Sequence, residues 1–143
     1  MEMHRPRIYE RYTLKAAERL KLRKQIETLF QRGEAFSVLR LRVVYLLAAA
    51  GNTAAGSPVR VGFSIPKKRL KKAVQRNRVR RLLREAWRHQ KHDLYAQVPA
   101  GQQLQVFLIY TYNDVCTFED AQTSVNKCLY QLSKRLVAPP GHG

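Results

Sequence analysis

The sequence is poor in acidic residues: it has 10 Asp and Glu against 27 Lys and Arg, which gives a formal net charge of +17. A surplus of this size repels itself within a compact chain unless an anionic partner lies close. The candidate partners are nucleic acid, an acidic protein and an anionic membrane surface. The few acids are scattered, and the only local group is Asp114, Glu119 and Asp120. A nuclease that holds two Mg²⁺ ions needs clustered carboxylates, so the sequence argues against an active site of that kind in this chain.

Long apolar segments are also absent. The longest uninterrupted apolar run, residues 43–50, is too short to cross a bilayer. The first residues, MEMHRPRIYERY, have no apolar signal-peptide core. We therefore expect a soluble cytoplasmic protein. A chain of 143 residues can form one domain with a proper core, and no internal repeat is visible.

The sequence offers no recognisable catalytic or metal-binding set. Its two cysteines, Cys116 and Cys128, lack metal-ligand or CxxC spacing and are expected to be reduced, partly buried thiols. His89 and His92 would bind a metal only with further ligands that the sequence does not supply. There is no Gly-rich phosphate loop and no Ser/His/Asp set. Any chemistry is therefore expected to lie in a partner.

The N-terminal part of the chain predicts a basic arm and one helix. Residues 1–20 are polar and basic without a period, which favours a flexible arm that touches the partner electrostatically or is simply solvated. The apolar spacing of Leu22, Ile26, Leu29 and Phe30 then predicts a short amphipathic helix. Gly33 is placed to end this helix with a left-handed cap.

Three apolar stretches predict strands. SVLRLRVVYLLA (37–48) alternates, which predicts one long strand with Leu39, Leu41, Val43, Tyr45 and Leu47 on its core face. After a loop at 51–58, VRVGFSI (59–65) predicts a second strand, antiparallel to the first. Gly62 within it marks either a bulge or a close backbone approach. QLQVFLIY (103–110) is apolar enough for the interior of a sheet.

The remaining segments predict two helices. One runs from about residue 70 to about residue 89, and the last contains the apolar positions of 118–136. Thr117 and Asp120 are spaced as a capping box for the last helix. The tail at 138–143 is expected to be disordered. The fold class is therefore α+β: a two-layer sandwich with one mixed, mainly antiparallel sheet of about four strands and three helices in the order α-β-β-β-α-β-α.

The stretch KKAVQRNRVRRLLREAWR (71–88) concentrates Lys and Arg, opposed only by Glu85. At about 100° per residue, one face of this helix is apolar and the opposite face carries mainly arginine. The apolar face is Val79, Leu82, Leu83, Ala86 and Trp87, and the other is Asn77, Arg80, Arg81, Arg84 and Arg88. Guanidinium groups suit bidentate contacts with phosphate. The pattern favours backbone recognition of a nucleic acid over a solvated surface face, which would normally interleave acids.

The same run, read as KKAVQRNRVRRLLREAW and preceded by VGFSIPKK, closely resembles the signature of the protein subunit of bacterial ribonuclease P. The match includes the Arg-Asn-Arg core at 76–78 and the spacing of Ala73, Arg80 and Arg81. In element order the resemblance extends from about residue 21 to about residue 136.

The resemblance implies a small basic protein cofactor of a ribozyme that removes the 5′ leader from precursor tRNA, with Mg²⁺ held mainly by the RNA subunit. It implies a left-handed βαβ crossover through the basic helix, as in the ribosomal protein S5 domain 2-like fold, against the usual right-handed rule. We then expect a ribonuclease P domain at 21–137 and a monomer, one copy per RNA. We expect precursor tRNA as a second partner, no membrane partner, and no activity of the protein alone.

The resemblance also assigns binding residues. Those expected to hold the RNA subunit are Lys67, Lys68, Lys71, Lys72, Arg76, Asn77, Arg78, Arg80, Arg81 and Arg84. Phe30 and Tyr45 match family aromatics of a leader cleft on the sheet, where single-stranded bases would stack. Both are explained equally well as core residues. Ile26 departs from the pattern, because many relatives carry an aromatic there.

Two competing interpretations stay open. A structural RNA-binding protein of ribosomal type, without a role in tRNA processing, would share the charge and a related architecture. A DNA-binding or membrane-surface protein would also use a basic amphipathic helix. Membrane binding would need a free apolar face, whereas Leu83 and Trp87 are expected to lie in the core.

Overall fold

The computed structural model describes residues 16–20, 22–49 and 57–137. In these ranges the helices are a 3₁₀ turn η1 (Ala16–Glu18), α2 (Arg23–Arg32), α3 (Ala73–Gln90), α4 (His92–Gln97) and α5 (Phe118–Val137). The strands are β1 (Glu34–Val38), β2 (Leu41–Ala49), β3 (Val59–Ser64) and β4 (Gln102–Tyr110). The expected arm at 1–15, most of the loop at 51–58 and the tail at 138–143 lie outside the described residues.

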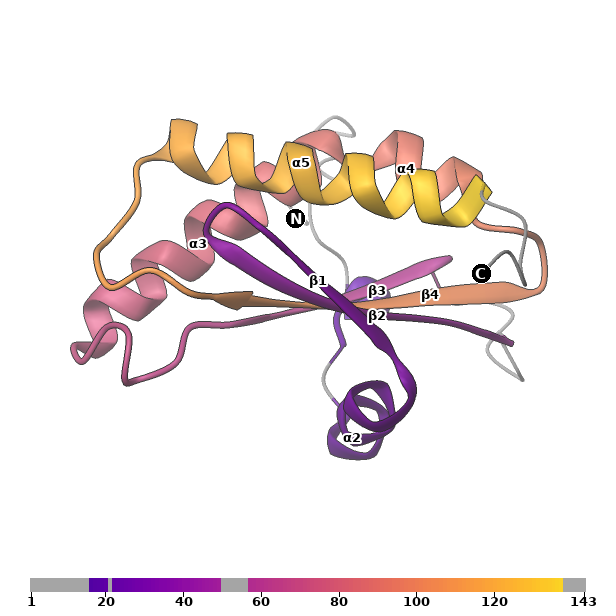
Figure 1. Cartoon of the computed structure of the whole chain (residues 1–143), viewed down its shortest axis with the longest axis horizontal. Helices are drawn as coiled ribbons and strands as arrows, with labels where there is room; N and C mark the ends of the chain where they lie inside the picture. The colour runs from indigo at the N-terminus through magenta and orange to yellow at the C-terminus, as the bar shows by residue number, and fades with distance from the viewer. Residues whose placement is uncertain (1–15, 21, 50–56, 138–143) are drawn as a thin grey trace, which may run out of the picture.

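The four strands form one sheet in the order β1-β2-β4-β3. Strand β2 is antiparallel to both β1 and β4, whereas β3 and β4 are parallel. Helices α3, α4 and α5 lie on one face of the sheet, and α2 lies on the other (Figure 1). The predicted α+β class and the mixed, mainly antiparallel sheet are confirmed. The left-handed sense of the β3-α3-β4 crossover stays a prediction.

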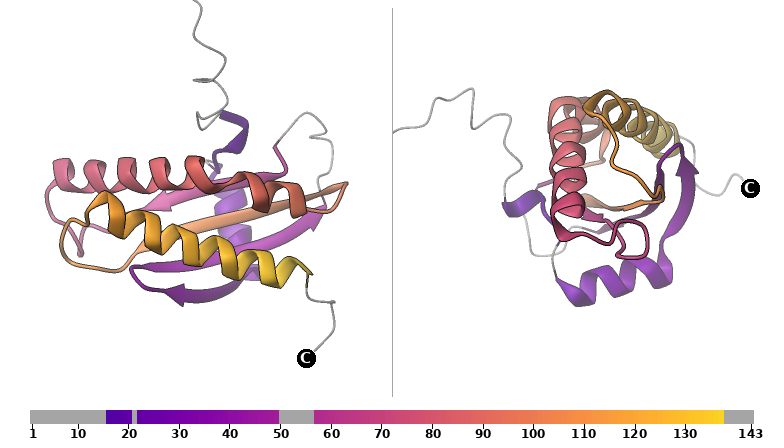
Figure 2. Two further views of the ribbon diagram at one scale, coloured as in Figure 1. Left: turned by 90° about the horizontal axis from the view of Figure 1, so that it is seen from above. Right: turned by 90° about the vertical axis from the view of Figure 1, so that its left-hand side faces the viewer.

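The main core lies between the sheet and the α3 and α5 layer, as the two further views make clear (Figure 2). Its largest fully buried side chains include Trp87 and Leu83 of α3 and Tyr110 of β4. A smaller apolar cluster of Leu20, Leu29 and Val44 joins α2 to the opposite face. Both faces of the sheet therefore contribute to the core, although α2 covers only part of its own face.

The long strand predicted at 37–48 is wrong: the chain folds there into a hairpin. Val38 pairs with Leu41, so only two residues make the turn. Leu39, expected on the core face, lies in this turn with a positive φ of 44° and 46% of its surface exposed. A non-glycine residue rarely adopts this conformation, and the apolar alternation ran through the turn without a Gly, Asn or Asp to mark it.

The predicted antiparallel pairing of the strands at 37–48 and 59–65 is also wrong. Strand β4 lies between β2 and β3 and pairs with both. The partner of β3 is therefore about 45 residues away in sequence, across the whole of α3 and α4. Local patterning carries no information on such a distant insertion.

Gly33 does end α2, but not with the expected left-handed cap. Its φ and ψ of −80° and 170° are extended, and its N–H donates to the Leu29 carbonyl at 2.8 Å. A Cβ at this position would lie 2.5 Å from the Leu29 carbonyl oxygen and 2.7 Å from that of Tyr45. Glycine is therefore required by close backbone packing between α2 and β2 rather than by its backbone angles.

The capping box of the last helix is confirmed. The Asp120 N–H donates to Thr117 Oγ1 at 3.1 Å, and the Thr117 N–H donates to Asp120 Oδ2 at 3.3 Å. These bonds hold the pKa of Asp120 below its usual value. The carboxylate also lies 3.4 Å from Arg40. Both cysteines are free and buried, as expected.

Residues 16–20, which the sequence analysis places in the flexible arm, belong to the folded domain. Leu20 is 4% exposed, and its N–H donates to the Val61 carbonyl of β3 at 2.9 Å. Helix α4 was not predicted, because its six residues are too few to show a helical period.

Replacing Leu83 with alanine tests how firmly α3 is anchored. Because this side chain is 1% exposed, we expect Leu83→Ala to lower the free energy of unfolding by roughly 2 to 5 kcal/mol. Arg81→Ala, on the exposed side of the same helix, is the matched control and should change it by less than about 0.5 kcal/mol. Urea denaturation measures both, and equal losses would mean that the helix faces are reversed.

Candidate nucleic-acid interface

Helix α3 is fixed to the sheet by one face. Val79, Leu83, Ala86 and Trp87 are all buried, as the helical projection predicts. The Trp87 ring packs edge-on against Phe63 with centroids 6.4 Å apart, and its Nε1–H donates to the Tyr95 hydroxyl at 3.1 Å. Because this face is buried, it is not available to a membrane surface.

The opposite face of α3 presents most of the residues that the sequence analysis assigned to RNA binding. Asn77, Arg78, Arg81 and Arg84 are exposed, and Arg80 is half-buried. Arg80 Nη1 donates to Asn77 Oδ1 at 2.9 Å, which orders two of the assigned side chains on the surface. The arrangement gives a row of guanidinium groups whose direction is set by the buried face.

Two arginines of the helix have structural partners. Arg76 Nη1 donates to the carbonyl oxygens of Leu70 and Lys71 at 2.9 and 2.8 Å, so this side chain holds the preceding loop against the helix. Arg88 is paired with Glu85, with its Nη2 2.8 Å from Oε2 and 2.9 Å from Oε1. The arginine face is thus least compensated toward the N-terminal end of α3, while Arg76 shapes the site.

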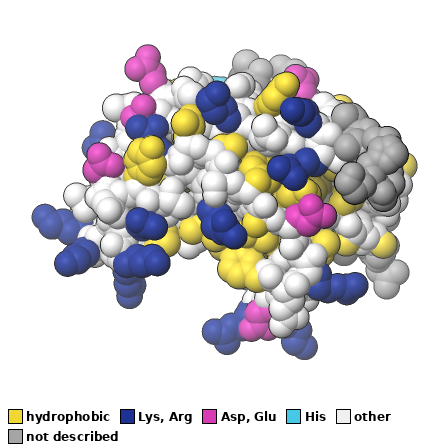
Figure 3. Space-filling view, in the orientation of Figure 1, with side chains coloured by type: hydrophobic (Ala, Val, Ile, Leu, Met, Phe, Trp, Pro, Cys, Tyr) yellow, Lys and Arg dark blue, Asp and Glu magenta, His cyan; other side chains and the backbone are white. Residues whose placement is uncertain are grey.

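The loop before α3 adds lysines to the same end of the molecule. Lys67, Lys68, Lys71 and Lys72 are all exposed. Helix α3 begins without a side-chain cap on its first turn, so the positive end of the helix dipole adds to their field. No acid occurs in the sequence between Glu34 and Glu85. Figure 3 shows Lys and Arg gathered over this end of the molecule.

The two aromatics assigned to a leader cleft lie on opposite faces of the sheet. Phe30, 51% exposed, packs edge-on against Phe107 on the α2 face, with centroids 5.4 Å apart. Tyr45 points to the other face, where its ring packs against Phe36, 5.8 Å away, and lies under Arg135. Partial burial raises the pKa of Tyr45. The structure therefore does not bring Phe30 and Tyr45 into one cleft on one face.

A groove runs between α2 and the end of β2, and Phe30 is not among the residues that line it. It has a volume of about 610 Å³, and its lining includes Lys24, Gln25, Arg32, Leu46 and Gln105. Basic, amide and apolar side chains together suit a single strand of nucleic acid, whose backbone is charged and whose bases are apolar on their faces. Ile26, which departs from the family aromatic, packs against the apolar cluster beneath α2.

Sequence reasoning missed Phe107, and for Gly62 it left a bulge and a close approach open. A Cβ on Gly62 would lie 2.6 Å from the Phe107 ring, so the glycine makes room for the aromatic that supports Phe30. The register of β3 with β4 is continuous, so Gly62 marks a close approach and not a bulge. Alternate residues of a strand share one face, so Phe107 lies on the same face as Gln105 and Ile109 of β4. This alternation could have placed Phe107 on the less apolar face of the sheet.

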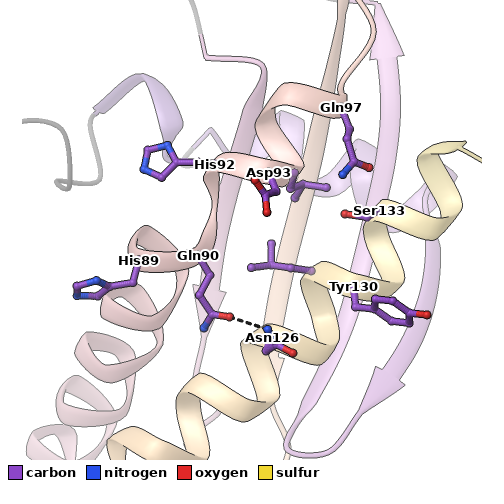
Figure 4. Close-up of a pocket in the computed structure, with 10 residues that line it drawn as sticks. His89, Gln90, His92, Asp93, Gln97, Asn126, Tyr130 and Ser133 are labelled. Atoms are coloured by element: carbon purple, nitrogen blue, oxygen red, sulfur yellow. Dashed lines mark hydrogen bonds between the residues drawn. The ribbon is translucent and has the colours of Figure 1, made fainter.

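A second hollow, of about 520 Å³, lies on the helical side between α3, α4 and α5 (Figure 4). Asn126 Nδ2 donates to Gln90 Oε1 across it at 3.1 Å. Its lining includes His89, His92 and Asp93 but none of the residues assigned to RNA. Among the described residues no three His, Cys, Asp or Glu side chains lie close enough together to hold a metal ion.

In the part of the chain that the structure describes, no helix has the length and apolar character needed to span a membrane.

A family model described as Ribonuclease P matches residues 14–133. The chain belongs to the ribonuclease P family. The family match includes η1, the groove beside α2 and the whole of the basic helix. The resemblance inferred from the sequence is thereby confirmed.

Curated relatives agree with this family. The chain is 48% identical over 83 residues to the ribonuclease P protein component of Porphyromonas gingivalis. The aligned residues cover 58% of each protein. It is 30% identical over 104 residues to the ribonuclease P protein component of Chlorobium phaeobacteroides, covering 68% of this chain and 71% of that protein. The match thus spans little more than half the length of the first relative.

Solved structures show the same fold. The RNase P protein of Staphylococcus aureus superposes with a TM-score of 0.63 at 21% identity, covering 82% of this chain and 95% of that one. The RNase P protein of Thermotoga maritima gives a TM-score of 0.60 at 21% identity, with 80% and 96% covered. At this identity the likeness concerns the fold alone.

A double variant tests the exposed face of α3. We expect Arg80→Ala/Arg84→Ala to weaken binding to a ribonuclease P RNA and to reduce the slope of log affinity against log salt by roughly 0.7 to 0.9 per lost phosphate contact. The melting temperature should change little, because both side chains lie on the surface side of the helix.

The matched control is Lys127→Ala/Lys134→Ala, which removes the same charge from exposed positions of α5. Filter binding over a salt series gives both slopes. Equal reductions in the two double variants would show that net charge, and not the α3 face, governs binding.

Proposed function

We propose that this chain is the protein subunit of ribonuclease P and that it acts by binding the RNA subunit through α3 and the loop before it. The observation that carries the proposal is the row of exposed guanidinium groups on a core-anchored helix within a ribonuclease P domain. A structural RNA-binding role alone explains the charge, but the family match does not favour it.

The binding surface consists of side chains that reach phosphates from two elements. Lys67, Lys68, Lys71 and Lys72 of the loop act as point charges, and Asn77, Arg78, Arg80, Arg81 and Arg84 of α3 follow the backbone of the RNA. Arg76 contributes by holding the loop carbonyls in place. Recognition of this kind reads the shape and charge of RNA rather than base edges.

We propose that the chemistry, hydrolysis of the phosphodiester between leader and tRNA, takes place in the RNA subunit. The donor groups of the described residues do not fit a Mg²⁺ site, because Asp120 is engaged by Thr117 and Arg40 and no three potential ligands lie together in that part of the chain. In this proposal the RNA holds the Mg²⁺ that the reaction requires. The protein lowers the repulsion between RNA and substrate, as one copy per RNA.

We propose that the leader of precursor tRNA crosses α2, with its phosphates in the groove on one side of this helix and a base stacked on Phe30 outside that groove. Phe30 is half-exposed and is supported from below by Phe107. Lys24 and Arg32 line the groove and suit the leader phosphates. Tyr45 lies on the opposite face, so it contacts the leader only if the leader passes around the edge of the sheet.

Single-turnover cleavage tests the cofactor role. We expect this protein to accelerate cleavage of a precursor tRNA by a bacterial ribonuclease P RNA at low Mg²⁺ and low salt, because its cations reduce phosphate repulsion. The protein freed of RNA should not cleave. Tight RNA binding without acceleration would favour the structural RNA-binding role, and cleavage by RNA-free protein would place the chemistry in this chain.

Leader binding has its own test. Phe30→Ala should weaken binding of a precursor tRNA with a single-stranded leader by roughly 1 to 3 kcal/mol, the value of one base stacked on an aromatic. Binding of mature tRNA, which lacks the leader, should not change.

Tyr45→Ala is the comparison on the opposite face. Loss of leader affinity in Tyr45→Ala but not in Phe30→Ala would move the leader to the α5 side, and loss in both would show that it crosses the sheet edge. Leader affinity unchanged in both variants would contradict leader binding by either aromatic.

A further inference from the structure

Residues 18–20 lie along the outer edge of the sheet, beside α3 (Figure 2). Arg19 forms a parallel bridge with Val61 of β3, and the Leu20 N–H donates to the Val61 carbonyl at 2.9 Å. This short segment covers part of the β3 edge.

A buried ion pair fixes this segment to the end of α3. Glu18 Oε2 accepts hydrogen bonds from Lys91 Nζ at 2.6 Å and from the Tyr95 hydroxyl at 2.7 Å. The side chains of Glu18 and Lys91 are each 6% exposed. The Tyr95 hydroxyl also accepts the bond from Trp87 Nε1, so the pair is connected to the core anchor of α3. A buried pair tolerates little displacement, because separation would leave uncompensated charges.

The pair places Arg19 beside two arginines already assigned to RNA. Lys91 follows Arg84 by seven residues and Arg80 by eleven, so all three lie on nearly one line along the helix. Arg19 is adjacent to the residue that Lys91 binds. The pKa of Arg84 is lowered first by burial and then by the charges of Arg19 and Arg80. The charges of Arg19 and Arg80 therefore both act on the Arg84 guanidinium, so a phosphate that binds Arg84 is attracted by all three side chains.

We propose that Arg19 is a further RNA-binding residue, which joins Arg80 and Arg84 in a single phosphate-binding site, and that the Glu18–Lys91 pair positions it there. The ligand is a backbone phosphate of the RNA subunit. This inference rests on the proposed function and extends it to a segment that sequence reasoning assigned to a flexible arm. Arg19 makes the phosphate contact, whereas Glu18 and Lys91 act through it.

The site is tested by the affinity of the full chain for a bacterial ribonuclease P RNA over a salt series. Arg19→Ala should weaken binding about tenfold, as expected for one hydrogen-bonded charge, and reduce the salt slope by roughly 0.7 to 0.9. Arg19→Lys should keep most of the slope but lose part of the affinity. Arg23→Ala, an exposed arginine of α2, is the matched control and should have less effect on both.

A double-variant cycle tests whether the arginines share one phosphate. If they do, Arg19→Ala/Arg84→Ala should bind more tightly than the product of the two single losses predicts, because the second change removes a partner of a contact already lost. In Arg19→Ala/Arg23→Ala the loss of affinity should equal the product of the two single losses. If the loss of affinity equals the product of the single losses in both double variants, the arginines do not share one phosphate and the proposed site is overturned.

Glu18→Gln separates positioning from folding. It removes the charge of the buried pair and keeps an acceptor oxygen. We expect it to weaken RNA binding in the wild-type background but not in the Arg19→Ala background, with all measurements made well below the melting temperature of each variant. Equal weakening in both backgrounds would show a general structural effect and contradict positioning.

The outcomes separate this inference from the proposed function. If the wild-type chain fails to bind ribonuclease P RNA, the proposed function fails and this site with it. If the wild-type chain binds and Arg84→Ala weakens it, while Arg19→Ala matches the Arg23→Ala control, only the present inference fails.

Discussion

Burial of Trp87 and Leu83 against the sheet is the constraint on which the rest of the structure depends. Both are at most 1% exposed, and a helix held at these positions cannot rotate without exposing them at a cost of several kcal/mol. The arginine row therefore has a fixed direction, away from the core. Trp87 also connects through Tyr95 to Glu18, so the same anchor fixes the N-terminal segment on which Arg19 lies.

Charge is distributed so that the protein alone carries an uncompensated surface. Three of the acids are engaged by neighbouring side chains: Glu85 by Arg88, Asp120 by Thr117 and Arg40, and Glu18 by Lys91. None lies between Glu34 and Glu85 in the sequence, the stretch that forms most of the basic loop and helix. Such a surface favours a partner with a high density of phosphates, which agrees with a ribonuclease P domain.

Local patterns predicted the elements well, and long-range arrangement poorly. The periodicity of α3 and the Thr117–Asp120 box carry their information within a few residues, so both were found. The turn at Leu39 lacks a turn residue, and the insertion of β4 between β2 and β3 depends on distant pairing. Strand parity placed Tyr45 with Val43, but it could not say that α2, and hence Phe30, covers the other face. Arg76 looked like its neighbours, yet its guanidinium is bonded to loop carbonyls that only the fold brings near.

Tethered hydroxyl-radical cleavage tests most directly whether the exposed side of α3 faces the RNA subunit. An iron chelate is attached to Val74→Cys, a position of α3 that is 71% exposed, or to Tyr130→Cys of α5, which is 62% exposed. The native Cys116 and Cys128 are buried, and burial raises the pKa of both thiols, which slows their labelling. The account predicts strong, localised cleavage of ribonuclease P RNA from position 74 and little from position 130. Cleavage from position 130 alone would contradict it.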